Sequence, residues 1–338
     1  MNSKQKLTSY SRGSGCGCKI APADLESILS QSGAAAHFDN LLIGNEAKDD
    51  AAVVDWGDGS ALISTTDFFQ PIVDDPYDFG YIAAVNAISD VYAMGGKPLV
   101  AIAILGWPVE KLGHEMAAKV IEGGRAACEN EGIALGGGHS IDAIEPFFGL
   151  AVNGRVVSKN IKTNSGAQVG DKLYLSKAIG TGIIAAASKR GIAKSDHVDF
   201  VSSLMKQSNT VGGQLGEMES VHAITDITGF GLLGHLIEMC EGSQVSAAIQ
   251  FDSVPVLPDG MLDEYLAQFV MPDNTMRNFK ATDGKCSQLN ARQLQVLCDP
   301  QTSGGLLVSS SEDLVAKFPE FVEIGSILPK GELLVEVS

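Results

Sequence analysis

Five aspartates stand in stretches that are otherwise apolar. They are Asp49 and Asp50 before AAVV, Asp67 after ISTT, Asp90 in NAISDVYAM, and Asp226 between AIT and IT. A buried, unpaired carboxylate is very costly, so such groups need cations or hydrogen bonds. Carboxylates from several elements suggest one shared cation site, and oxygen-only ligands favour Mg²⁺ or Mn²⁺ over zinc. Any one of these aspartates could instead cap a helix or serve a turn.

The N-terminal segment carries a second chemical group, in GSGCGCKI. Cys16, Cys18 and Lys19 lie close together among glycines and serines, a composition that predicts a mobile arm rather than a packed element. A neighbouring cation favours the thiolate, so the arm suits a soft nucleophile or a handler of a soft chalcogen. Metal binding is an alternative, although CxC without a second Cys/His pair is incomplete for zinc. An inert tail is the other alternative.

Three glycine-bearing segments could approach phosphate groups: LGGGHS at 135–140, TGFGLLGH at 228–235 and TSGG at 302–305. Glycines let the backbone approach phosphate oxygens, and helix N-termini attract anions. None of the three is a P-loop or a dinucleotide-binding fingerprint, and each could be a plain tight turn. His139 could contact a nucleotide or satisfy a backbone carbonyl.

Composition and charge limit the function classes. The chain has 338 residues, 19% charged and 45% hydrophobic, with a net charge of −17. These values exclude a disordered chain and argue against nucleic-acid binding, and an anionic substrate would need metal ions or a local Lys or Arg. The longest apolar stretch covers 12 positions, too few for a membrane span, and the N-terminus lacks the apolar core of a secretory signal. We therefore expect a cytoplasmic protein without a disulfide framework.

The elements that must position these groups are those of a mixed α/β fold. Two apolar runs flank Gly57-Asp58-Gly59 and predict a hairpin, so a mixed sheet is favoured over a doubly wound one. In the first half we expect a buried strand at 98–106, further strands at 133–138 and 147–157, and helices at 23–31, 78–94 and 110–131. In the second half we expect strands at 172–177, 223–228, 246–252, 304–310 and 321–327, and helices at 178–190, 198–217 and 230–241. The region 278–297 shows no clear period. The polar stretch 158–170 is the best boundary between the two halves. We expect an arm with a short helix (1–48), an N-terminal α/β domain that carries most of the aspartates (49–157) and a C-terminal α/β domain (170–338).

The motifs together resemble one family. The segments SYSRGSGCGCKI, GNEAKDDAAV, ISTTDFF, NAISDVYAMGGKP, GGGHSID, TDITGFGLLGH and CDPQTSGG, in this order, are similar to those of selenophosphate synthetase (selenide, water dikinase). The resemblance implies synthesis of selenophosphate from selenide, ATP and water, with release of AMP and orthophosphate. It also implies the two-domain α/β fold of the aminoimidazole ribonucleotide synthetase superfamily, and a homodimer with a β-barrel at its interface.

The resemblance further assigns residues by motif position. Cys16 matches the catalytic cysteine and Lys19 the essential lysine. In the same chain, the nucleotide would be contacted by Lys19, Ala47, Lys48, Asp49, Asp67 and Asp90. From the partner subunit it would be contacted by Gly138, His139 and Ser140. Mg²⁺ would be held by Asp50, Asp90 and Asp226.

The physical interpretation agrees with this assignment. Mg²⁺ between aspartates and phosphates would reconcile anionic ATP with an acidic protein, and a glycine-hinged arm could deliver selenide and then exclude water. Two alternatives remain open. Another ATP-dependent enzyme of the superfamily would have no use for the Cys-Gly-Cys-Lys arm. A non-catalytic selenium or metal carrier would not need buried aspartates.

Overall fold

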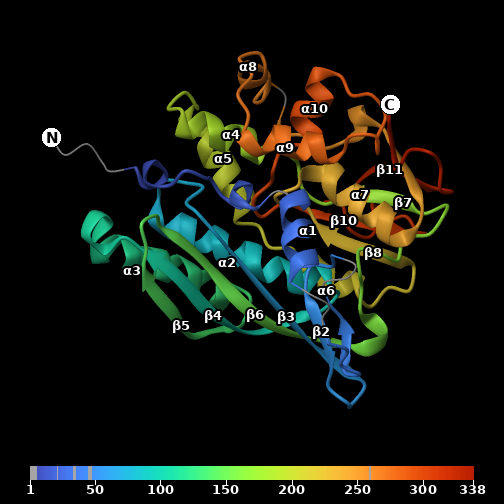
Figure 1. Cartoon of the computed structure of the whole chain (residues 1–338), viewed down its shortest axis with the longest axis horizontal. Helices are drawn as coiled ribbons and strands as arrows, with labels where there is room; N and C mark the ends of the chain where they lie inside the picture. Colours follow the sequence, from blue (N-terminus) through green and yellow to red (C-terminus); the bar gives the residue numbers. More distant parts are fainter. Residues whose placement is uncertain (1–5, 21, 33–35, 45–47, 259) are drawn as a thin grey trace.

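The chain folds into two α/β halves, each built on a mixed six-stranded sheet (Figure 1). The computed structural model describes residues 6–20, 22–32, 36–44, 48–258 and 260–338. In this part of the chain no helix is both long and apolar enough to cross a bilayer. The mixed sheets confirm the fold class expected from the hairpin and the irregular alternation of elements.

The first half has the sheet order β1-β2-β3-β6-β4-β5, in which only β4 and β5 pair in parallel. The expected hairpin at Gly57-Asp58-Gly59 joins β2 and β3, with Asp55 opposite Ala61. The elements are β1 (Leu41–Ile43), β2 (Ala52–Asp55), β3 (Ser60–Phe69), α2 (Pro76–Ala93), β4 (Lys97–Trp107), α3 (Val109–Asn130), β5 (Ala134–Asp142), β6 (Phe147–Val157) and the 3₁₀ turn η3 (Ser158–Asn160).

Helix α2 is the central element of the molecule. Its residues from Phe79 to Ala93 are buried except Tyr81, because the first sheet covers one side and the second half covers the other. A helix that is apolar almost all round is stable only in such a position. The few polar residues on α2 therefore lie in the interior, between the two halves.

The outer face of the first sheet is only partly covered. Phe68, Val100, Ile102 and Ile141 are more than one-third exposed, and the strand register places them on the face opposite α2. The prediction of a fully buried strand at 98–106 is therefore wrong. Helices α2 and α3 cover one face of β4, and nothing in the described chain covers the other.

The second half has the sheet order β12-β9-β11-β7-β10-β8, in which only β12 and β9 pair in parallel. Its strands are β7 (Lys172–Leu175), β8 (Val221–Asp226), β9 (Ser246–Ile249), β10 (Leu306–Ser310), β11 (Val322–Leu328) and β12 (Val335–Val337). Its helices are α4 (Thr181–Lys189), α5 (Ser195–Met205), α6 (Val211–Leu215), α7 (Gly231–Ser243), η4 (Phe251–Ser253), α8 (Asp263–Leu266), α9 (Asp273–Ala281) and α10 (Ala291–Leu297).

Three details of the second half differ from expectation. The helix expected over 198–217 is two helices, α5 and α6, because the chain breaks at Asn209, whose buried amide donates to Ser89 Oγ and to the Gly304 carbonyl. The region without a clear period contains α9 and α10, which are too short to show one, although a capping box of Asn290 and Gln293 starts α10. Strand β12 was not predicted, because only three residues form it.

The N-terminal arm is packed in this structure. It comprises η1 (Leu7–Tyr10), η2 (Cys16–Cys18) and α1 (Pro22–Gln31), and Leu7 and Cys16 are fully buried. The expectation of an unpacked segment is therefore wrong for this structure, since hydrogen bonds from both halves hold the arm, while its mobility stays a prediction. Helix α1 forms as predicted, but its apolar side chains Leu25, Ile28 and Leu29 are exposed.

Candidate active site

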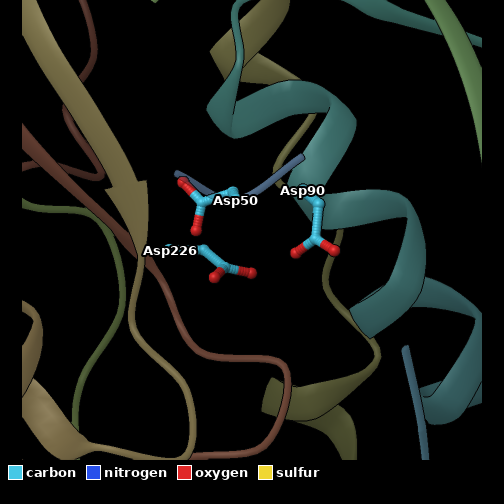
Figure 2. A group of neighbouring side chains, drawn as sticks. All are labelled: Asp50, Asp90 and Asp226. Carbon is cyan, nitrogen blue, oxygen red and sulfur yellow. The ribbon is translucent and has the colours of Figure 1, made fainter. Parts of the chain in front are cut away.

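Three aspartates from distant parts of the sequence meet between the two halves. Asp50 precedes β2, Asp90 lies on α2 and Asp226 ends β8. One carboxylate oxygen from each lies within 4.8 Å of the others. Figure 2 shows the three side chains grouped together. The sequence-based expectation of a single acidic cluster is met by these three residues.

Hydrogen bonds orient two of the carboxylates but leave oxygen atoms without partners. Thr65 Oγ1 donates to Asp90 Oδ2 at 2.5 Å, and Thr225 Oγ1 donates to Asp50 Oδ1 at 3.0 Å. The Oδ2 atoms of Asp50 and Asp226 are buried and have no hydrogen-bond partner among the described residues. Oxygens of this kind are the ligands that a hard divalent cation takes, so the donor set fits Mg²⁺.

The electrostatics of the cluster point the same way. Burial, reinforced by the neighbouring carboxylates, raises the pKa of Asp50 and of Asp90 well above the ordinary range. Burial also raises the pKa of Asp226 to about 6. Without a cation, these groups would compete for protons near neutral pH. Metal binding requires the ionised carboxylates, so a bound cation would offset the repulsion among them.

A chain of hydrogen bonds connects the arm to Asp67, a carboxylate outside the acidic cluster that lines the same cavity. Asn86 lies one turn before Asp90 on α2, and its Nδ2 donates to Asp67 Oδ2 at 2.8 Å. Asn86 Oδ1 accepts from Cys16 Sγ at 3.2 Å and from the Ser303 backbone N–H at 2.8 Å. One buried amide therefore connects β3, the arm and the 302–305 turn.

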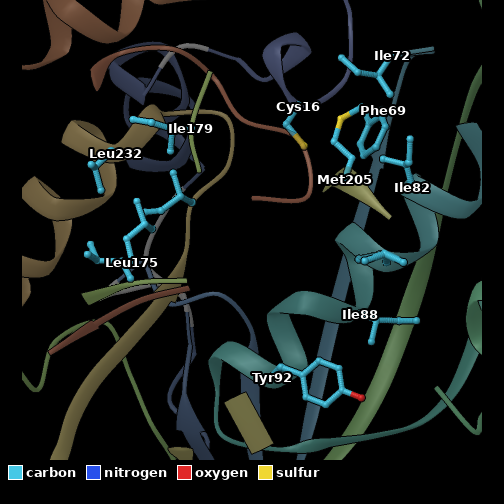
Figure 3. Close-up of a cluster of buried hydrophobic side chains, with 14 of the residues drawn as sticks. Cys16, Phe69, Ile72, Ile82, Ile88, Tyr92, Leu175, Ile179, Met205 and Leu232 are labelled. Carbon is cyan, nitrogen blue, oxygen red and sulfur yellow. The ribbon is translucent and has the colours of Figure 1, made fainter. Parts of the chain in front are cut away.

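Cys16 lies at the inner end of the arm and is 1% exposed. In Figure 3 it is packed near Phe69 and Met205, at the edge of the main hydrophobic core. Its backbone N–H donates to Thr302 Oγ1 at 3.1 Å. The arm thus presents Cys16 to the interior, whereas a mobile segment would leave it exposed to solvent.

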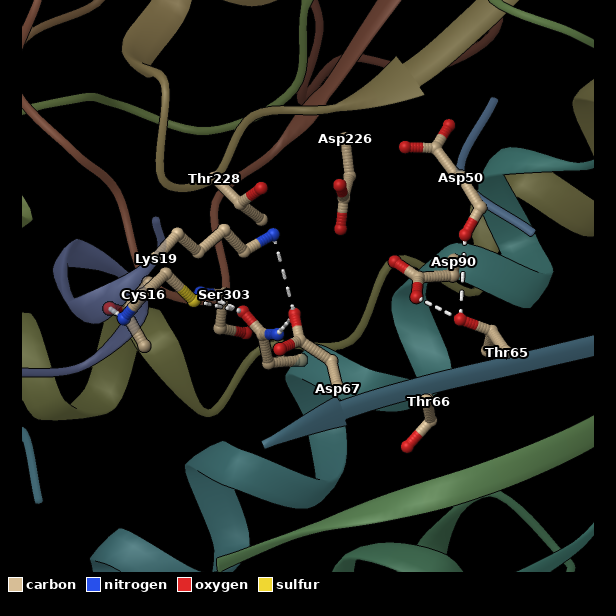
Figure 4. Close-up of polar contacts among 12 residues, drawn as sticks. Cys16, Lys19, Asp50, Thr65, Thr66, Asp67, Asp90, Asp226, Thr228 and Ser303 are labelled. Carbon is tan, nitrogen blue, oxygen red and sulfur yellow. Dashed lines mark hydrogen bonds and ion pairs between the residues drawn. The ribbon is translucent and has the colours of Figure 1, made fainter. Parts of the chain in front are cut away.

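Lys19 reaches toward the acidic cluster from the same turn of the arm (Figure 4). Its Nζ lies 3.8 Å from Asp67 Oδ2 and 5.9 Å from the centroid of the Phe230 ring. The Asp67 carboxylate, more than any other group, raises the pKa of Lys19 above its ordinary value. Lys19 is therefore a fixed positive charge beside the candidate metal ligands.

These side chains line a cavity of about 330 Å³, within the size range of small-molecule sites. Two lysines, Lys19 and Lys48, face six carboxylates: Asp49, Asp50, Asp67, Asp90, Asp226 and Glu238. Asp49 Oδ1 accepts from the Asn164 backbone N–H at 2.9 Å, and the Asn164 amide donates to the Lys48 carbonyl. Ala47 lies outside the described residues. An anionic ligand would enter this cavity only with cations.

The segment LGGGHS is strand, not a turn. Gly138, His139 and Ser140 belong to β5, an edge strand of the first sheet, and do not line the cavity of the same chain. Gly138 is fixed by close approach, because an added Cβ would lie 2.2 Å from the Ala103 carbonyl oxygen. His139 pairs in register with Ile104, on the outward face of the sheet.

The glycine segment at 228–235 leads into α7 and contributes side chains that were not expected. The Thr228 backbone N–H donates to His235 Nε2 at 3.2 Å, and His235 Nδ1 faces Glu238 Oε2 at 3.6 Å. Because Nε2 accepts, the ring proton lies on Nδ1. Burial lowers the pKa of His235 to about 3 and raises the pKa of Glu238 to about 7. A neutral histidine therefore braces the glycine turn against the cavity wall.

Several residues of the site were missed from the sequence, chiefly Asn86, Thr65 and Thr302. A signal existed for Asn86, a polar residue four positions before Asp90 on an otherwise apolar helix. Thr65 lies two positions before Asp67 and so faces the same side of β3. Thr302 begins the glycine-bearing segment 302–305, but no local pattern pairs it with Cys16, which is 286 positions away.

Comparison with protein families assigns both halves to one superfamily. The model for AIR synthase related protein, N-terminal domain, matches residues 48–156, and the model for AIR synthase related protein, C-terminal domain, matches residues 168–330. Together they span most of the chain, which has the two-domain α/β fold of that superfamily.

Individual relatives are more specific. The chain is 52% identical to a selenide, water dikinase of Photobacterium profundum, with 98% of this chain and 99% of the relative covered. It is 49% identical to a selenide, water dikinase of Escherichia coli O6:H1, with 98% of each covered. Among solved structures, thiamine monophosphate kinase from Aquifex aeolicus matches with a TM-score of 0.68 at 18% identity, over 94% of this chain and 96% of that one, which shows a shared fold.

Proposed function

The chain belongs to the selenide, water dikinase family, and we propose that the cavity between its halves is where selenide, ATP and water become selenophosphate, AMP and orthophosphate. The observation that carries this proposal is the meeting of three aspartates, with two orphaned oxygens, and an arm that presents Cys16 and Lys19. The relatives favour this activity over a carrier or another enzyme of the superfamily.

Asp50, Asp90 and Asp226 would hold Mg²⁺. Their unpartnered oxygens and raised pKa values support this role. When bound, Mg²⁺ supplies charge stabilisation to the phosphates and to the oxygens freed as each phosphoanhydride breaks. Thr65 and Thr225 would keep the carboxylates oriented toward the cation.

Lys48 and Asp49 would line the ATP site, with Ala47 beside them in sequence. The position of Lys48 and Asp49 on the cavity wall supports the assignment. Asp67 and Asp90 would contact the Mg-ATP complex. Lys48 and Lys19 are the two cations of the cavity lining, so they would offset phosphate charge that the metal does not.

Cys16 and Lys19 would handle selenide. Selenide is soft and anionic, so a thiol sulfur and an ammonium in one turn suit it. Asn86 holds the Cys16 sulfur, and Asp67 holds the Lys19 ammonium. Lys19 would stabilise charge on the transferring phosphoryl group or on the hydroselenide, and removal of one such preorganised contact costs about 3 kcal/mol, or about a hundredfold in rate.

The packed arm would also exclude water during the transfer to selenium. Because Cys16 is buried and the arm bonds to both halves, its closed position seals one side of the cavity. Water must attack in a later step, since the products are AMP and orthophosphate rather than ADP. We propose that the reaction runs in the reducing cytoplasm, because hydroselenide and a reactive thiol are both readily oxidised.

We further propose a homodimer that closes a β-barrel over the outer face of the first sheet. The exposed Phe68, Val100, Ile102 and Ile141 on that face support it, since exposed apolar patches of this kind mark interfaces. Gly138, His139 and Ser140 would then reach the nucleotide of the partner subunit. In this proposal the arm (1–48), the metal-binding domain (49–157) and the C-terminal domain (170–338) act as separate units.

Phosphorus-31 NMR of the protein with Mg-ATP under anaerobic conditions tests the activity. We expect a selenophosphate signal that requires selenide, with matching AMP and orthophosphate, and its loss in Cys16→Ser. Cys286→Ser is the matched control, because Cys286 is half-buried near β12, away from the cavity lining. ADP as the final nucleotide, or full activity in Cys16→Ser, would contradict the proposal.

A further inference from the structure

Lys189 makes an unusual contact with the N-terminal arm. Its Nζ, at the end of α4, donates to the carbonyl oxygens of Ser11, Arg12 and Gly13 at 2.7, 2.9 and 2.8 Å. An ammonium has three donors, and here three consecutive carbonyls take them. We call this set of contacts the carbonyl clamp. It connects residues nearly 180 positions apart in the sequence.

The carbonyl clamp contacts a stretch of the arm that has no regular secondary structure of its own. Residues 11–15 lie between the two 3₁₀ turns, where the Ser11 hydroxyl donates to the Gly13 carbonyl at 3.1 Å but most other backbone groups need partners from outside the arm. Lys189 supplies the donors, and Gln70 supplies acceptors, since the Gly13 N–H donates to Gln70 Oε1 at 2.7 Å and the Gly15 N–H donates to the Gln70 carbonyl at 3.0 Å. Both polar sides of the same short stretch are therefore satisfied, one by each half of the molecule.

The clamp determines how far the arm enters the site. Gly13 is three residues before Cys16, and the intervening Gly15 fits against Thr302 with no room for a Cβ. A stretch fixed at its start by Lys189 and at its end by Thr302 leaves little freedom for the Cys16 sulfur. Lys189 itself lines a different cavity, together with Arg12 and Gly13 of the arm. Among the described residues, its hydrogen bonds go to the arm and not to the acidic cluster of Asp50, Asp90 and Asp226.

We propose that Lys189 is a positioning residue for selenophosphate synthesis, which holds the arm so that Cys16 and Lys19 reach the acidic cavity. This inference rests on the proposed function of the arm. It differs from a general role in stability, because the clamp contacts the arm and not the core of either half.

The test compares Lys189→Met, which keeps the aliphatic stem but removes the donors, with Lys189→Arg, which keeps donors and charge. Lys194→Met is the matched control, because Lys194 forms an exposed 2.7 Å ion pair with Glu264 and does not touch the arm. We expect Lys189→Met to lower kcat for selenide-dependent AMP formation about 10- to 100-fold, as a misplacement of about 1 Å does. The KM for ATP should stay within about twofold, and Lys189→Arg should recover much of the loss.

A second measurement follows how accessible the Cys16 sulfur is to solvent, independently of activity. The rate of alkylation of the Cys16 sulfur by iodoacetamide, followed by mass spectrometry, should rise about tenfold or more in Lys189→Met and not in Lys194→Met, while the buried Cys128 and Cys240 stay protected. Unchanged alkylation, or activity equal to the control, would overturn the clamp. If the wild-type protein makes no selenophosphate, the proposed function fails, and the alkylation rates still decide whether Lys189 holds the arm.

Discussion

The acidic cluster and the N-terminal arm meet in one cavity but are held in place in different ways. Asp90 and Asp226 belong to α2 and β8, which are buried and regular. The part of the arm before Lys19 has only short 3₁₀ turns, and Lys189, Gln70 and Thr302 of other segments hold it. The cluster is thus part of the fold, whereas the arm is attached to it.

This difference separates two tasks of the enzyme. A cluster built from core elements keeps its geometry before substrate arrives, which is what metal binding and charge stabilisation require. In the proposed function, an arm fastened by a few hydrogen bonds would leave and return without unfolding either sheet, and so would admit the substrate. Variants that damage one region and spare the other test this separation.

The largest effect is expected for Asp226→Asn. Loss of one candidate Mg²⁺ ligand removes several kcal/mol of charge stabilisation, so AMP formation should fall about a thousandfold or more. The thermal stabilisation that Mg²⁺ gives the wild-type protein should disappear, while the unfolding temperature without metal should not fall, because a buried carboxylate becomes neutral. Calorimetry with and without Mg²⁺, with the exposed Asp252→Asn as control, checks this. A retained Mg²⁺ effect would exclude Asp226 as a ligand.

A smaller, arm-specific effect is expected for Gly15→Ala. Gly15 has φ +53°, and an added Cβ would lie 2.2 Å from Thr302 Oγ1, so the arm must shift. Activity should fall about 10- to 100-fold, while Mg²⁺ should still stabilise the protein. Gly59→Ala is the control, because it has φ +83° and open space, and pays only a backbone cost of roughly 1–2 kcal/mol. Loss of the Mg²⁺ effect in Gly15→Ala would show that the two regions depend on each other.

A different kind of effect, on the pH dependence of stability and not on activity, concerns Asp299, next to the 302–305 turn that bonds to the arm. Asp299 Oδ2 accepts from the Gly182 and Ile183 N–H groups, and burial raises the pKa of Asp299 to about 8, from 3.8. Between about pH 4 and 8 the folded protein therefore binds a proton that the unfolded chain does not. The free energy of unfolding should fall through this window as pH rises, by at most about 1.4 kcal/mol per pH unit.

Asp299→Asn imitates the protonated acid and should remove this contribution. Urea unfolding at several pH values measures it as the difference between the wild type and the variant, so that other titrating groups cancel. The advantage of the variant should grow from about pH 4 to 8 and then level off. Parallel stability curves would mean that Asp299 titrates normally.

The sequence predicted the positions of helices and strands better than it predicted which of their faces are buried. The 57–59 hairpin and the long helix α2 were correct because turn residues and apolar periodicity are local signals. The buried strand at 98–106 was wrong because its outer face depends on what covers it. The strand expected at 133–138 exists but continues to Asp142, because the glycines that suggested a turn after it are themselves part of the strand. The roles of the site residues stay predictions, although the structure brings Asp50, Asp90 and Asp226 together.

By itself, the sequence singled out the candidate groups for the chemistry. A carboxylate in an apolar segment destabilises the fold unless a cation or a hydrogen bond pairs with it, so its presence can be recognised from the sequence. The cysteine–lysine pair among glycines is likewise a local pattern. Only the tertiary structure decided that Asn86 connects Cys16 to Asp67, that the arm is packed, and that Lys189 holds it. These contacts join segments tens to hundreds of residues apart, and such pairings depend on how the two halves pack, which no local pattern contains.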